Sequence, residues 1–165
     1  MARIDASLTQ VLESVVARLH DQIDTARGSN CYLSLDPDMI VNGRPGDHFF
    51  IVTPLDGNFD DALIAGGGQQ QATVDSTFTV TIHSVRKKDR AGESSEFLNS
   101  ETTGIITLGT DVLQALVSHD LVDLGGDEVG FEPISPISYN VGQKGDGTSG
   151  WLQIAFNVLF DWDLS

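Results

Sequence analysis

The chain has 165 residues, 40% of them hydrophobic, and its 24 acidic residues against nine basic ones give a formal net charge of −15. A chain of this length and composition is typical of one domain with a single core. The negative charge opposes tight binding to nucleic acids and anionic membranes, and no apolar run reaches the ~20 residues that a membrane span requires.

The N-terminal segment predicts an amphipathic helix, because apolar side chains recur at spacings of three and four between residues 4 and 26. Asp5 or Ser7 can cap its start, and Gln10 stands in capping-box position relative to Ser7. We expect Gly28 to end the helix. The N-terminus lacks the regions of a signal peptide, which predicts a protein made and kept in a cytosol.

Three strands are expected next. Two short ones, residues 31–35 and 49–53, are separated by the turn-rich residues 36–47. A second irregular stretch is expected to begin at Pro54 and to include the glycines of residues 66–68. The alternation then returns in residues 72–85, which predicts a long strand with the final strand as its partner. Its apolar face comprises Val74, Phe78, Val80 and Ile82.

A second helix is predicted within residues 105–119, where apolar residues could line a core face and Thr110 can cap the main helical part. Residues 129–139 are predicted to be extended. Pro133 and Pro136 interrupt them, so they form an edge strand at best. The glycine-rich residues 142–150 predict a hairpin tip that leads into the last strand.

The last strand carries the strongest pattern in the chain, since every second residue is large and apolar. At about 3.3 Å per residue it is roughly twice as long as a typical strand. A strand of this length suggests a sheet larger than a small compact core needs, or an edge offered to another subunit. We expect its apolar face to close the core and its backbone edge to be free for a neighbouring subunit. The apolar face comprises Leu152, Ile154, Phe156, Val158, Phe160 and Trp162.

This order of elements predicts an α+β fold, with an antiparallel or mixed β-sheet flanked by two main α-helices that pack on one face. Neither an internal repeat nor a domain linker is visible. We therefore expect residues 1–165 to form a single domain.

The search for chemistry gives mostly negative results. The four histidines, His20, His48, His83 and His119, are far apart in sequence and have no second ligand at metal-binding spacing. Cys31 is the only cysteine, so it cannot form an internal disulfide, and we expect it to pack as a small hydrophobic residue. No catalytic, cofactor-binding or metal-binding residue is predicted, and no cofactor.

Carboxylates occur in two short groups, Asp36 with Asp38 and Asp60 with Asp61. They could help to hold a hard cation, but neither group continues into an EF-hand pattern, and turn capping is the favoured interpretation. The basic residues 86–90 lack interleaved aromatic residues. A solvated loop is favoured there over a contact with an acidic partner.

The order of elements also resembles a known family. A helix at residues 8–23, strands at Tyr32 and residues 49–52, a long strand at residues 78–82, a helix at residues 111–119 and a closing strand at residues 150–158 are similar to the tail terminator (tail-tube completion) proteins of long-tailed bacteriophages. The resemblance rests on element order and on the ending. Residues 36–47 and 56–71 are longer loops than the smaller members have.

The resemblance implies a virion structural protein without catalysis, assembled in the host cytoplasm. It implies a homo-hexameric ring that caps the tail tube and touches two further partners, the major tail tube protein and the head-tail connector or neck protein. Genomic DNA would pass through the lumen without specific binding, and no membrane would be involved.

Three alternatives remain open. The chain could be another neck or tail-tube component, such as a head-closure or tail-completion protein. It could be a small hydrolase that uses Asp36, Asp38 and one histidine, or a soluble cellular adaptor that binds a peptide along its sheet edge.

Overall fold

The computed structural model describes residues 5–26, 28–38, 48–59, 71–85, 104–117, 133–143 and 149–163. Its elements in chain order are β1 (Asp5–Ala6), α1 (Leu8–Gln22), η1 (Asp24–Ala26), η2 (Gly28–Asn30), β2 (Cys31–Leu33), β3 (His48–Phe59), β4 (Gln71–Val85), α3 (Ile105–Leu116), β5 (Ser135–Gln143) and β6 (Ser149–Asp163).

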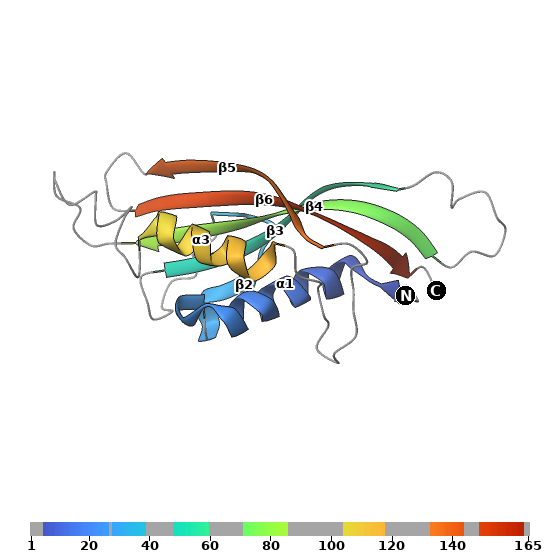
Figure 1. Ribbon diagram of the computed structural model, residues 1–165, viewed down its shortest axis with the longest axis horizontal. Coiled ribbons are helices and arrows are strands. Elements are labelled where there is room, and N and C mark those ends of the chain that lie inside the picture. Colours follow the sequence, from blue (N-terminus) through green and yellow to red (C-terminus); the bar gives the residue numbers. More distant parts are fainter. Residues whose placement is uncertain are drawn as a thin grey trace.

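The strands form one six-stranded sheet. Strands β1, β6, β4, β3 and β2 follow one another across it, and β5 pairs with β6 on the side of β6 away from β4. The β1–β6 and β2–β3 pairs are parallel and the others antiparallel. Both helices lie on the same side of the sheet (Figure 1). The predicted α+β fold with a mixed sheet and two main helices is confirmed.

Helix α1 begins with the predicted capping box. The Ser7 hydroxyl accepts from the Gln10 amide at 3.2 Å, and the Gln10 side chain accepts from the Ser7 amide at 2.8 Å. The expected end at Gly28 is wrong, because the helix stops at Gln22 and two short 3-10 turns follow. Ile23 adopts an extended conformation and is buried, so core packing of this residue ends the helix before the glycine.

Helix α3 begins at Ile105, so its N-cap is Gly104 and not the predicted Thr110. Thr110 lies in the middle of the helix, where its hydroxyl donates to the Ile106 carbonyl at 3.1 Å. A threonine can bond to the carbonyl four residues earlier without ending a helix. The apolar side chain of Ile105, fully buried next to Gly104, belongs to the core and fixes the helix start.

Strand β3 is longer than its sequence predicts. Pro54 and Gly57 do not open a loop, because the strand continues to Phe59 through an irregularity in its pairing with β4 between these two residues. A bulge of this kind accommodates a proline within a strand. Of the predicted loop 56–71, residues 56–59 therefore belong to β3, residue 71 belongs to β4, and residues 60–70 lie outside the described ranges.

Strand β6 confirms one prediction and corrects another. Its alternate apolar side chains are buried from Leu152 to Phe160, and it pairs with β4 along its whole length as expected. The prediction that its backbone edge is free is wrong, because β5 pairs with its first half and β1 with Asp161 and Trp162. The returning strand β5, predicted as an edge strand, takes the outer position.

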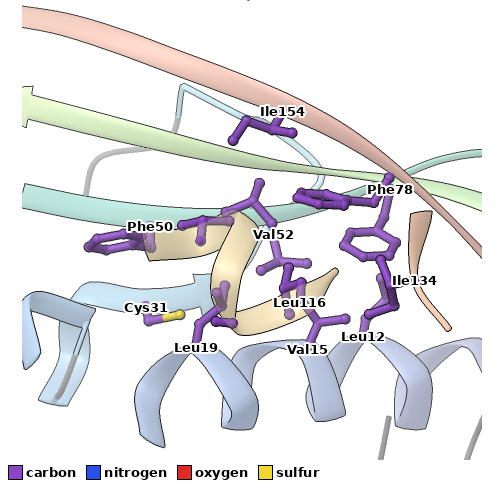
Figure 2. Packing of buried hydrophobic residues seen from close by; sticks show 14 of the residues in the cluster. Leu12, Val15, Leu19, Cys31, Phe50, Val52, Phe78, Leu116, Ile134 and Ile154 are labelled. Carbon is purple, nitrogen blue, oxygen red and sulfur yellow. The ribbon is translucent and has the colours of Figure 1, made fainter. Parts of the chain in front are cut away.

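The core lies between the two helices, α1 and α3, and the face of the sheet that they cover. Figure 2 shows Leu12, Val15 and Leu19 of α1 pointing from below towards the strands. Phe78 of β4 and Phe156 of β6 are register partners, both fully buried, with ring centroids 5.4 Å apart. These contacts join the two helices and the central strands into one core.

Candidate interaction surface

The residues weighed for hydrolytic chemistry meet at only one place in the described ranges. His83 of β4 is buried, and its Nε2 lies 2.7 Å from the Pro37 carbonyl and 3.7 Å from a carboxylate oxygen of Asp38. A carbonyl oxygen only accepts, so Nε2 is the donor of the shorter contact. The histidine therefore ties the turn after β2 to the sheet, and that nitrogen carries a proton.

The two carboxylates at this turn have local partners. Asp36 accepts from the amide of Asp38 at 2.9 Å, and the amide of Asp36 donates to the Ser34 hydroxyl at 3.1 Å. Side-chain bonds of this kind are typical of Asx and Ser turns. The geometry agrees with the turn-capping interpretation of Asp36.

Cys31 is buried at the start of β2, on the side of α1 that faces the sheet (Figure 2). Desolvation by burial raises the pKa of its thiol to about 12. The thiol is therefore neutral at pH 7, and since the thiolate is the nucleophilic form, Cys31 packs as a small hydrophobic residue.

Two of the remaining residues considered for chemistry lie in described elements, and the others do not. His20 is exposed on α1 and His48 lies at the start of β3, whereas His119, Asp60, Asp61 and the basic residues 86–90 fall outside the described ranges. Within those ranges, no group of three or more His, Cys, Asp and Glu side chains could hold a metal ion. None of the described helices is long and apolar enough to cross a membrane.

An apolar groove between α3 and β5 is the surface feature that the sequence reasoning missed. It has a volume of about 440 Å³, within the ~300–1,000 Å³ range of ligand-binding pockets. Tyr139 and Val141 of β5 are the register partners of Ile154 and Leu152, so they project on the face that carries α3. Ile106 of α3 forms the other side of the groove and is half exposed.

The close approach of α3 to β6 shapes this groove. At Gly109 a β-carbon would lie only 2.3 Å from a methyl carbon of Leu152, so the glycine lets the helix rest directly on β6. Strand β5 lies beyond that contact, at the top of Figure 1. No described helix covers it. Tyr139 therefore remains 73% exposed although it belongs to the same sheet face as the core.

A second, polar cleft of about 450 Å³ lies where the end of α1 and η1 meet α3. Its lining includes the polar side chains of Asp24, Asp111 and Gln114 and the apolar side chain of Leu108. Nearby, the Arg18 Nε donates to the Ala115 carbonyl at 2.8 Å and connects α1 to the last turn of α3. The contact satisfies a carbonyl at the helix end.

The fold has a match among solved structures, although the sequence matches no known family. No protein-family model matches the sequence, and no curated protein sequence matches it. Among solved structures, the chain is similar to one chain of the structure described as the virion of a native gene transfer agent (GTA) particle. The TM-score is 0.58 at 15% sequence identity, and the match covers 94% of this chain and 98% of that chain. The likeness therefore extends over the whole fold.

Proposed function

We propose that this chain is a structural protein of a phage-like virion and, more specifically, a tail terminator. In this role, copies of the chain form a hexameric ring that stops growth of the tail tube and joins it to the head connector. The observation that carries the proposal is the fold likeness to a chain of the gene transfer agent virion, which spans nearly the full length of both chains. The element order that resembles tail terminators supports the same role.

The mechanism is steric. A closed ring on the last tube ring leaves no surface for another tube subunit to add to, and the opposite face of the ring meets the neck. The net charge of −15 supports a lumen through which DNA slides, because like charge opposes contacts with phosphates. The proposed role is non-catalytic, consistent with a raised pKa at the Cys31 thiol and a His83 ring bonded to a backbone carbonyl.

Deletion of the gene from the phage-like element that carries it tests this role. Electron microscopy of the resulting lysate is expected to show tail tubes of uncontrolled length, unattached to filled heads, and the plasmid-borne gene should restore normal particles. Particles of normal length and infectivity without the gene would refute the proposal.

The same experiment separates the terminator from the alternative neck role, which the fold likeness also allows. Loss of a head-closure protein is expected to give tails of normal length beside heads that leak DNA. Uniform tail lengths in the deletion would thus assign the chain to the neck and overturn the terminator role.

A further inference from the structure

Exposed apolar side chains gather at opposite edges of the sheet. Within the described ranges, the large apolar residues that are more than one-third exposed fall into three groups. One group surrounds the α3–β5 groove, a second lies at the end of β2 and just beyond it, and a third lies on the far part of β3. The groups are Ile106, Ile137, Tyr139 and Val141; Leu33 and Leu35; and Leu55 and Phe59.

The groove has the properties of a docking surface. Strand β5 pairs only with β6 in the described part of the chain, so its outer backbone edge has no strand beside it there. A free edge next to apolar side chains is a template for another chain, and a soluble protein normally protects it with charges or a cover. On β5, this edge carries apolar side chains instead of charged ones: Ile137 and Tyr139 are both more than half exposed.

The distribution of charge permits a second copy as the occupant. The groove is lined by no charged side chain among the described residues, although the chain as a whole carries a net charge of −15. Two copies of so acidic a chain repel each other over most of their surface, and an uncharged apolar face is where a contact between them costs least. A second copy can therefore contact the groove without meeting an acidic side chain in its lining.

The second copy also carries a complementary patch. Leu35, 86% exposed, and Leu33 project beside β2, which is at the other end of the strand order from β5 and β1. A contact between two different patches is heterologous, and repetition of such a contact closes a ring when the rotation per subunit divides a full turn.

We infer that the α3–β5 groove binds the β2 edge of a second copy of this chain, with Leu33 and Leu35 of one copy seated against Tyr139 and Val141 of the next. The inference rests on the proposed ring, and it names the surface through which neighbouring copies meet. The far part of β3, with Leu55 and Phe59, stays outside this contact.

Three single substitutions test the two sides of the contact. Tyr139→Glu places a charge in the groove, Leu35→Glu places one on the opposite edge, and Leu55→Glu is the matched control at a similarly exposed position on β3. Because all three side chains are at least half exposed, circular dichroism and thermal unfolding of the monomer should change little. Native mass spectrometry is expected to show that the first two variants weaken self-association roughly 30-fold or more, whereas the control assembles like the wild type.

Mixing the two interface variants tests whether the contact is heterologous. The Tyr139→Glu chain keeps an intact β2 edge and the Leu35→Glu chain keeps an intact groove, so each variant alone is expected to be a monomer. An equimolar mixture is expected to form a 1:1 dimer that cannot extend, and its two chains differ in mass. A mixture that remains monomeric would overturn the pairing of these two patches.

The outcomes also separate this inference from the proposed function. An oligomeric wild type whose Tyr139→Glu variant assembles equally well would overturn the groove as the contact and leave the ring role standing. A wild type that is monomeric at all concentrations, with and without tail-tube subunits, would overturn both. Dissociation of the Leu55→Glu control to the same extent as the two interface variants would overturn the assignment of the contact to these edges.

Discussion

Replacement of Phe156 by alanine removes the centre of the core. The side chain is fully buried on β6 and stacks on Phe78 at a centroid distance of 5.4 Å. A Phe→Ala change at such a site costs ~3–5 kcal/mol, part of it from the lost ring pair. With an m-value of ~2 kcal/mol/M, a loss of ~4 kcal/mol lowers the urea midpoint by ~2 M.

Phe59 supplies the matched control, because Phe59→Ala is the same chemical change at a 52% exposed position. Phe59 stacks on Trp162 at 6.1 Å, so we expect a smaller loss of ~1–2 kcal/mol. Urea unfolding followed by tryptophan fluorescence measures both variants under conditions where the chain is monomeric. If Phe156→Ala cost no more than Phe59→Ala, β6 would not be the central core strand described here.

Three further predictions concern the helix ends and the thiol. Ser7→Ala should lower the free energy of unfolding by ~1 kcal/mol through loss of the capping box, while Ser7→Thr should cost only a few tenths; equal losses in urea unfolding would refute this. Arg18→Met, which keeps an apolar stem but not the bond to Ala115, should cost ~1 kcal/mol in the same assay, and an unchanged midpoint would speak against the contact. Burial raises the pKa of the Cys31 thiol from 9.0 to about 12. The stability that the folded state gains by holding this thiol neutral is therefore complete below pH 9 and is lost as pH rises towards 12. Stability measured against pH should therefore fall more steeply above pH 9 in the wild type than in Cys31→Ala, and parallel curves would contradict the burial.

The elements with strong periodicity could be predicted from the sequence. The alternate apolar residues from Leu152 to Phe160 specify a strand with one buried face, and the Ser7–Gln10 capping box specifies the start of α1. Both signals are local, because they depend on side chains a few residues apart. The structure confirms them.

The position of a strand within the sheet is not a local property. The unusual length of β6 suggested a free edge, yet β5 returns along it, and only the tertiary pairing shows this. Likewise, Pro54 and Gly57 are typical loop residues, but the pairing with β4 keeps them in a bulged strand. Long-range contacts overrode the local signal in both cases.

The candidate groove was missed for a related reason. Ile137, Tyr139 and Val141 already show apolar residues at a period of two, which would have been the available signal. In sequence, such a pattern predicts a buried face. These side chains are exposed because no described helix covers β5. A groove between α3 and β5 depends on the contact at Gly109, which no spacing in the sequence reveals.

Cryo-electron microscopy of a head-tail junction, in particles produced with this gene present, is the decisive measurement for the proposed terminator role. We expect a ring of six copies of this α+β fold between the last tail-tube ring and the head connector, with β5 of each copy beside the β2 edge of its neighbour. A junction built from other chains, with this protein absent from the particle or located elsewhere in it, would refute the terminator role.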